Sequence, residues 1–146
     1  MPYYIYLYKD RQELEIERDE NPTMSDDTYT IILGNEVGLP IGVCLDDIKM
    51  IKIFPFNLDD SDNDIVKCKI IWNVFHEIRH AWQHSKQLFT EENIDLKSGN
   101  IKKYYNHPSE RDANSFADKL YESNIDDILR ILEVKKGNII KSKRLH

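Results

Sequence analysis

The chain has 146 residues, 40% of them hydrophobic and 32% charged, and a formal net charge of -6 at pH 7. This length is typical of one domain with a substantial core, so we expect a single domain over residues 1–146. The acidic balance argues against nucleic-acid binding as the main role, and the lack of a signal peptide or an apolar span favours a cytoplasmic protein without membrane association.

The first part of the chain, residues 1–56, is predicted to be rich in β-strands. Most of the predicted strands are short runs of aromatic and β-branched residues, whereas Gln12 to Arg18 alternates polar and apolar residues. Asp46 and Asp47 separate two such runs and are typical of a hairpin turn. We therefore expect a mostly antiparallel sheet of about four or five strands ahead of the helices, which makes the fold class α+β. The predicted strands are Tyr3 to Tyr8, Gln12 to Arg18, Tyr29 to Leu33, Ile41 to Leu45 and Ile48 to Phe54.

A helix is predicted from about residue 64 to 86, and it contains an HExxH motif, since His76 to His80 read His-Glu-Ile-Arg-His. Two histidines four residues apart on a helix lie about 40° apart around its axis and roughly 6 Å apart along it, so both imidazoles can reach one metal ion. Glu77 points about 100° away from His76, which is too far round for an equivalent ligand. It can still reach a water on the metal and act there as the general base of a hydrolysis.

The alternative is a solvated helix face that carries two histidines by accident, because five-residue patterns recur by chance. The apolar residues of this helix follow the i, i+3, i+4 rule and predict one buried stripe, which leaves His76, Glu77 and His80 on the opposite half of the helix. The histidines are therefore not part of the predicted core stripe. The stripe consists of Ile71, Val74, Phe75, Ile78 and Trp82.

A catalytic zinc site needs a third protein ligand and leaves its fourth position to water. His84 continues the column of histidines, but eight helical residues place it about 12 Å from His76, so the two cannot bind the same ion. The longer pattern HExxHxxGxxH is also excluded, because Gln83 and Lys86 stand at its glycine and its third histidine. The third ligand must come from elsewhere in the chain.

The best source of that ligand is a second helix, predicted from about residue 109 to 123. Glu110 falls on the same face as Ala113 and Ala117, within about 60° of each, and the two alanines permit close approach of another helix. Together with the HExxH motif, this placement favours Glu110 as a metal ligand. The alternative is that Glu110 only favours the helix N-terminus through the helix dipole. Asp112 points away from the same face and is the weaker candidate.

The motif HEIRHAWQH, followed about thirty residues later by ERDANSFA, resembles the ImmA/IrrE-type zinc metallopeptidases, whose pattern is an HExxH helix and a downstream ExEAnxFA helix. The resemblance extends over roughly Ile70 to Leu120. It implies a small zincin-like domain of the gluzincin type, with His76, His80 and Glu110 as zinc ligands and Glu77 as the base.

The resemblance also bears on four neighbouring residues. Asn114 would stand where related gluzincins keep a group that orients a ligand histidine. His84 matches an extra histidine that is frequent in the family, with a structural or supporting role. Arg79 replaces a residue that is usually small in the family, so it would crowd the cleft or contact the substrate. Asp112 replaces a glutamate, which is a mild departure.

The remaining segments are predicted to support the helices. Pro108 suits a first helical turn, and Ser109 with Asp112 resembles a capping box, so the second helix should begin near Ser109. Ile125 to Val134 has a helical period, and residues 135–146 form a basic tail.

The polar connection of residues 90–107 leads directly to Glu110. It is either an ordinary surface loop or the rim of the metal cleft. On the second interpretation, Tyr104 and Tyr105 are candidate hydrogen-bond donors to a substrate or to the transition state.

The expected function is that of a metalloprotease: a hydrolase that holds one Zn²⁺ per chain and cleaves a peptide bond in a protein or peptide substrate, such as a regulatory protein or repressor. One alternative is a non-catalytic module with the zincin fold, which regulates a partner protein by docking. A further alternative is a zinc hydrolase that acts on something other than peptides. The patterns do not indicate an oligomeric state or the identity of the substrate.

Overall fold

A computed structural model describes residues 2–34, 39–89 and 106–134 of the chain. Within these ranges the protein has an α+β fold with a three-stranded sheet and five α-helices. In chain order the elements are β1 (Tyr4–Leu7), α1 (Arg11–Glu20), α2 (Asp26–Ile32), β2 (Gly42–Leu45), β3 (Met50–Ile53), a 3-10 turn η1 (Pro55–Asn57), α3 (Asn63–Ser85), α5 (Pro108–Ser123) and α6 (Ile125–Ile131).

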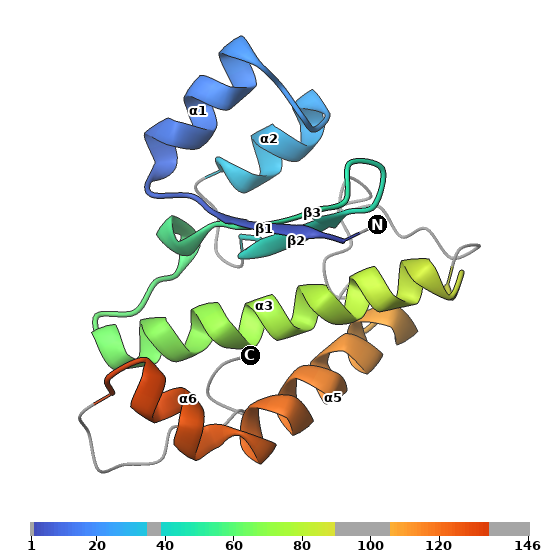
Figure 1. Ribbon diagram of the computed structural model, residues 1–146. Helices are drawn as coiled ribbons and strands as arrows, with labels where there is room; N and C mark the ends of the chain where they lie inside the picture. The colour runs from blue at the N-terminus through green and yellow to red at the C-terminus, as the bar shows by residue number, and fades with distance from the viewer. Residues whose placement is uncertain (1, 35–38, 90–105, 135–146) are drawn as a thin grey trace.

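The elements form layers around the long helix α3. Figure 1 shows α1 and α2 on one face of the sheet, α3 across the other face, and α5 and α6 on the far side of α3. Helix α3 therefore packs on two sides, against the sheet and against α5. The predicted helices over about residues 64–86 and 109–123 are confirmed to within about two residues at each end.

The sheet has the strand order β1-β3-β2. Strand β1 is parallel to β3, whereas β2 pairs with β3 in an antiparallel hairpin whose turn has a hydrogen bond from Lys49 N to Asp46 O. The predicted hairpin is confirmed. The expected sheet of four or five mostly antiparallel strands is wrong, because the described residues contain three strands with one parallel and one antiparallel pair.

The segment Gln12 to Arg18 is helical, not extended, and belongs to α1. Asp10 caps this helix by accepting a hydrogen bond from Glu13 N at 2.9 Å. Leu14 is the only buried residue of α1, and Ile16 is exposed, so the alternating pattern does not reflect a strand with one buried face.

The segment Tyr29 to Leu33 is also helical and belongs mainly to α2. Ser25 caps α2 by accepting a hydrogen bond from Thr28 N. Tyr29, Ile32 and Leu33 are buried at helical spacing, so tertiary packing outweighs the β-propensity of these residue types.

Three apolar clusters fill the spaces between the layers. Strand β3 separates two of them, because its side chains alternate: Ile51 and Ile53 face α3, while Lys52 points toward α1 and α2. The third cluster lies between α3, α5 and α6. The buried members of the cluster between the sheet and helices α1 and α2 are Tyr8, Leu14, Tyr29, Ile32, Leu33 and Phe54. Those of the cluster between the sheet and α3 are Ile51, Ile53, Val74 and Ala81. Those of the third cluster are Ile65, Cys68, Trp72, Ala117, Tyr121 and Ile128.

The predicted apolar stripe of α3 is divided between two neighbours. Val74 packs on the sheet, while Ile71 and Phe75 contact the cluster toward α5 and α6. Ile78 and Trp82 remain partly exposed, at 36% and 38%. The expectation of one buried stripe is therefore wrong, and the physical reason is that α3 has a covered face on each side. The histidine face lies between the sheet and α5 and is largely buried.

Helix α5 starts differently from the prediction. His107 is the residue that caps it, because its Nδ1 accepts a hydrogen bond from Ser109 N at 3.1 Å, and Pro108 is the first helical residue. The predicted capping box of Ser109 and Asp112 is wrong, since Asp112 contacts α3 instead.

Candidate metal centre

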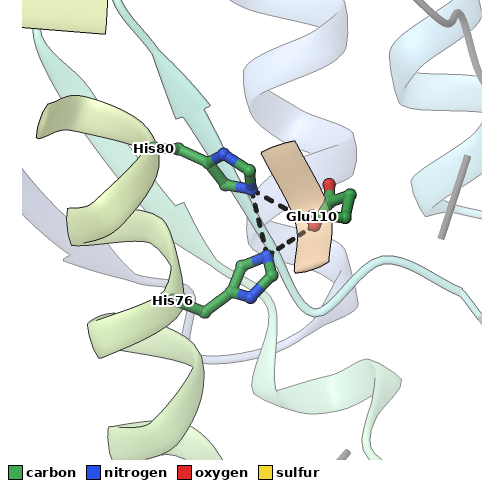
Figure 2. Close-up of side chains that lie close together, drawn as sticks. All are labelled: His76, His80 and Glu110. Atoms are coloured by element: carbon green, nitrogen blue, oxygen red, sulfur yellow. Dashed lines mark hydrogen bonds and ion pairs between the residues drawn. The ribbon is translucent and has the colours of Figure 1, made fainter. Parts of the chain in front are cut away.

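Three metal-ligating side chains converge where the middle of α3 meets the first turn of α5. Figure 2 shows His76 and His80 projecting from α3 toward Glu110 on α5. His76 Nε2 lies 2.8 Å from Glu110 Oε2, His80 Nε2 lies 3.3 Å from the same oxygen, and the two Nε2 atoms are 3.1 Å apart. The predicted helix geometry thus brings both histidines and Glu110 to one point.

The dimensions of this triangle suit one metal ion. Ligand atoms at about 2.0–2.1 Å from a tetrahedral centre are about 3.3 Å from one another, and the three observed separations are close to that value. The donors are two imidazole nitrogens and one carboxylate oxygen, which leaves a fourth position open. The buried group His76, His80 and Glu110 could therefore hold a metal ion.

Helix packing is what brings Glu110 so close to the histidines. Ala113 and Ala117 are fully buried on the face of α5 that meets α3, and their short side chains allow the two backbones to approach. Glu110 lies one turn before Ala113 on the same face. The close approach predicted from the two alanines is confirmed.

The electrostatics of the group favour a bound cation. Burial acts to raise the pKa of Glu110, but hydrogen bonds from His76 and His80 outweigh it and hold that pKa below its ordinary value. Burial acts to lower the pKa of His80, but the hydrogen bond to Glu110 and the charges of Glu77 and Glu110 raise it to about 9. The Glu110 carboxylate thus interacts with imidazole groups that favour a positive charge beside it, and a metal that replaces an Nε2 proton would release that proton to solvent.

Glu77 lies beside the triangle but is not part of it. Its Oε1 is 4.0 Å from His76 Nε2, and burial raises its pKa above the ordinary value. The side chain packs against Gly42 of β2, where an added Cβ would lie only 2.9 Å from Glu77 Cγ. Gly42 therefore makes the room in which Glu77 is held.

Strand β2 forms an outer edge of the sheet in the part of the chain that the structure describes. Phe54 N donates to Ile41 O, so in the alternating antiparallel ladder Val43 and Leu45 also pair with β3. The backbone groups of Gly42 and Cys44 then point outward from the sheet. Within the described residues no strand pairs with this outer edge of β2.

The Trp72 ring stacks on the His76 imidazole, with ring centroids 5.5 Å apart. His76 Nδ1 is buried and has no hydrogen-bond partner among the described residues. Asn114, expected to orient a ligand histidine, makes no hydrogen bond with His76 or His80 in the described part of the chain.

Gln83 contacts His80 in the way that was expected of Asn114, and the sequence interpretation did not identify it. Its Oε1 lies 2.9 Å from His80 Nδ1, and its Nε2 donates to Asp112 Oδ2 at 2.9 Å. The available signal was spacing, because Gln83 is three residues after His80 and shares its helix face.

Arg79 and Asp112 form an ion pair between α3 and α5, with Arg79 Nε 2.8 Å from Asp112 Oδ2. The Arg79 guanidinium also lies over the Trp82 ring, 3.7 Å from its centroid. Arg79 is therefore directed to α5. Asp112 is not one of the converging ligands, as expected, but it still contacts α3, through Arg79 and Gln83.

The other candidate residues lie away from the triangle. His84 is exposed near the end of α3 and is not part of the ligand group. His107 is the capping residue of α5, as described above. Tyr104 and Tyr105 lie outside the described residues.

Comparisons with family models, curated proteins and solved structures gave no match. None of the helices in the described ranges combines the length and the apolarity needed to cross a bilayer. What the structure defines is thus an α+β protein with a buried group of two histidines and one glutamate that could hold a metal ion. Its chemistry has to be argued from these residues.

Proposed function

We propose that this protein is a zinc-dependent endopeptidase of the zincin type, which cleaves a peptide bond in a protein substrate. The observation that carries the proposal is the convergence of His76, His80 and Glu110 with Glu77 directly beside them. The motifs that resemble the ImmA/IrrE-type metallopeptidases contain the same four residues, so the local geometry and the resemblance support one interpretation.

The ligand set favours zinc at one ion per chain. Two imidazole nitrogens and one carboxylate oxygen with an open fourth position are typical of catalytic zinc sites, whereas magnesium and calcium prefer oxygen ligands. Bound at this position, the ion would act as a Lewis acid toward the substrate carbonyl and lower the pKa of a water molecule. The protein supplies the remaining steps through Glu77.

Glu77 has the position and the environment of a general base. As a water oxygen attacks the peptide carbonyl carbon, one proton of that water passes to the Glu77 carboxylate. When the carbon–nitrogen bond breaks, Glu77 returns the proton to the leaving amine. Burial raises the pKa of Glu77, which makes its carboxylate a stronger base than one in water.

The outer edge of β2 offers a binding place for the substrate. Gly42 contacts Glu77, and the backbone groups of Gly42 and Cys44 point outward at this edge. An extended peptide could pair with these groups as an added strand and present its backbone to the metal centre. The proposed substrate class is therefore an extended segment of a protein, and we propose a cytoplasmic regulatory protein such as a repressor.

The proposal is tested by measuring metal content and hydrolysis on the same four proteins: wild type, Glu110→Ala, Glu77→Gln and His84→Ala. Each is purified without chelators, its zinc is quantified by mass spectrometry, and it is incubated with a proteome-derived peptide library. Wild type and Glu77→Gln should each hold close to one zinc. Glu110→Ala should lose most of it, because the third ligand is gone. Only wild type and His84→Ala should cleave peptides, since His84 is an exposed histidine outside the triangle.

Different failures have different meanings in this design. Wild-type protein that neither retains zinc nor takes it up on titration would overturn the metal centre. Equal hydrolysis by wild type and Glu77→Gln would overturn the role of the base. Full zinc occupancy without cleavage of any library or folded protein substrate would favour a non-catalytic module that regulates a partner protein.

A further inference from the structure

Gln83 occupies a buried position between α3 and the first turn of α5, one helical turn after His80. Only 4% of its surface is exposed. Its Nε2 donates to Ser109 O and to Asp112 Oδ2, both at 2.9 Å, and its Oε1 lies 2.9 Å from His80 Nδ1. All three contacts of the amide are therefore made to protein atoms that border the metal centre.

These contacts determine which way the Gln83 amide points. Ser109 O is a carbonyl and the Asp112 carboxylate is an acceptor, so both need a donor, and the amide NH₂ supplies two. A rotated amide would place its oxygen against these two acceptors, which is unfavourable. The oxygen must therefore face His80, and His80 Nδ1 must carry the proton of that hydrogen bond.

The protonation of Nδ1 determines which atom of His80 can bind a metal. When Nδ1 carries its proton, Nε2 is the nitrogen that can offer a lone pair to an ion. His80 Nε2 is the atom that faces His76 Nε2 at 3.1 Å and Glu110 Oε2 at 3.3 Å. Gln83 thus selects the form of His80 in which the lone pair points into the ligand triangle.

Arg79 holds the carboxylate on which this orientation depends. Its Nε donates to Asp112 Oδ2 at 2.8 Å, and its Nη2 lies 3.3 Å from Oδ1. The guanidinium is in turn stacked on the Trp82 ring. The result is a connected series from Arg79 through Asp112 and Gln83 to His80, which crosses from α3 to α5 and back.

We propose that Gln83 is a positioning residue of the metal centre, and that Asp112 acts through it. Gln83 holds His80 with its proton on Nδ1, and Asp112, fixed by Arg79, holds the Gln83 amide. This inference rests on the proposed metal centre and extends it to residues that are not ligands. It does not depend on the reaction that the centre catalyses.

The first test compares zinc affinity in Gln83→Leu and in a matched control, Gln12→Leu, which removes an exposed glutamine from α1. Groups that orient a ligand typically contribute about 10–100-fold to metal affinity. Gln83→Leu should therefore weaken zinc binding by about that factor in a competitive chelator titration, with an unchanged circular dichroism spectrum. Gln12→Leu should bind zinc like wild type. Wild-type affinity in Gln83→Leu would overturn the proposal.

A double-mutant cycle separates Asp112 from Gln83. If Asp112 acts through Gln83, Asp112→Ala should weaken zinc binding by about 10-fold in the wild-type background and by less than about 2-fold in the Gln83→Leu background. An equal loss in both backgrounds would show that Asp112 acts by another route, such as the placement of Glu110, and would overturn this part of the proposal.

A paired exchange tests whether the hydrogen bonds, and not the packing, are responsible. Gln83→Glu keeps an acceptor toward His80 but sets a carboxylate against Asp112, so it should weaken zinc binding. Adding Asp112→Asn removes the negative charge next to the new carboxylate, and part of the affinity should return. Wild-type zinc affinity in Gln83→Glu would contradict the hydrogen-bond assignment.

The hydrogen bond itself can be observed without metal. In ¹⁵N-labelled wild-type protein, the His80 Nδ1 proton should be protected from solvent exchange, and Gln83→Leu should remove the protection. If this signal behaves as expected while zinc does not bind, the metal centre fails and the Gln83 assignment stands. If the His80 Nδ1 proton exchanges equally fast in both proteins, the Gln83 assignment fails whatever the metal does.

Discussion

Gly42 is the residue where a single added methyl group should disturb the site most directly. In Gly42→Ala the new Cβ would lie 2.9 Å from both Glu77 Cγ and Ile53 Cδ1. Favourable carbon–carbon separations are about 3.5–4.0 Å, so both groups would have to move by roughly 0.5–1 Å. Such overpacking typically costs about 1–3 kcal/mol. Loss of glycine freedom in the unfolded chain offsets about 0.4–1 kcal/mol, because Gly42 has no positive φ.

The expected net effect on Gly42→Ala is a destabilisation of about 0.5–2 kcal/mol, or a fall in Tm of roughly 2–6 °C for a protein of this size. Zinc affinity should change little, because the atoms nearest to the new Cβ belong to Glu77 and Ile53 and not to the three ligands. Hydrolysis should fall much more, by up to about 100-fold, if Glu77 is displaced by 1 Å. Denaturant unfolding, zinc titration and peptide cleavage on the same preparation measure the three quantities.

A cycle with Ile53→Val identifies which neighbour moves. This change removes Ile53 Cδ1 and by itself should cost about 0.5–1.5 kcal/mol. In the double variant the contact with Ile53 is relieved, so the loss of stability should be smaller than the sum of the two single losses. Hydrolysis should stay low, because Glu77 is still displaced. Unchanged stability and unchanged hydrolysis in Gly42→Ala would refute the reasoning that Gly42 makes room for Glu77.

Two further predictions concern other parts of the structure. Asn114→Ala should retain zinc affinity within about 2-fold, whereas Asp112→Ala should weaken it roughly 10-fold. The reason is that Asp112 contacts Gln83, which contacts the ligand His80, while Asn114 has no such contact with a ligand. A loss greater than about 2-fold in Asn114→Ala, measured by the same competitive zinc titration, would contradict this ranking. Glu17→Leu should destabilise the fold by about 3–5 kcal/mol, because it leaves the buried Lys52 ammonium without its carboxylate. Glu17→Leu combined with Lys52→Met should recover only part of that loss, because the Tyr8 and Tyr29 hydroxyls also donate to Glu17. Burial acts to raise the pKa of Glu17, but hydrogen bonds from Lys52, Tyr29 and Tyr8 lower it overall; the stability it contributes is therefore complete above about pH 4.3 and is lost as the pH falls through the lower folded pKa. Below about pH 4, the free energy of unfolding should fall less steeply with decreasing pH in Glu17→Gln than in wild type. If the two proteins lose stability equally with falling pH, the proposed contribution of the Glu17 carboxylate is excluded.

The ligand geometry could be predicted from the sequence because it depends on local helix geometry. His76 and His80 are one turn apart on a single helix, and Glu110 shares a face with Ala113 and Ala117, two small residues that permit another helix to approach. Both helices have long apolar patterns and clear ends. The structure places the three side chains within one small triangle without any unexpected contribution from distant segments.

The sheet was harder to predict, because strand propensity and helix capping gave opposite indications in the first part of the chain. The Leu14–Ile16 alternation suggested a strand, yet Asp10 caps a helix immediately before it. Tyr29 to Leu33 contains strand-forming residue types, but Ser25 caps the preceding turn. In both cases the capping residue was the better signal. Its side chain accepts a hydrogen bond from a backbone N–H of the first helical turn, which would otherwise have no partner within the helix.

The contacts of Gln83 and Asp112 could not be derived from either helix alone. On a helix Glu110 and Asp112 point about 200° apart, which correctly implies that one cleft cannot use both as ligands. It does not reveal that α5 lies so close along α3 that Asp112 meets Arg79 and Gln83 while Glu110 meets the histidines. That arrangement depends on the relative placement of two helices, and no local periodicity encodes it.

This placement would give a bound metal ion a structural role that the isolated HExxH helix would not have. His76 and His80 belong to α3, Glu110 belongs to α5, and the connection of residues 90–105 between them lies outside the described residues. A metal ion bound by all three ligands would therefore join the two helices by coordination as well as by packing. Because it binds only when α5 is docked, the ion should stabilise the docked state by RT ln(1 + [L]/Kd), about 2.7 kcal/mol at a free concentration 100 times Kd. The protein should consequently unfold at a higher temperature when zinc is present, and Glu110→Ala should abolish that increase.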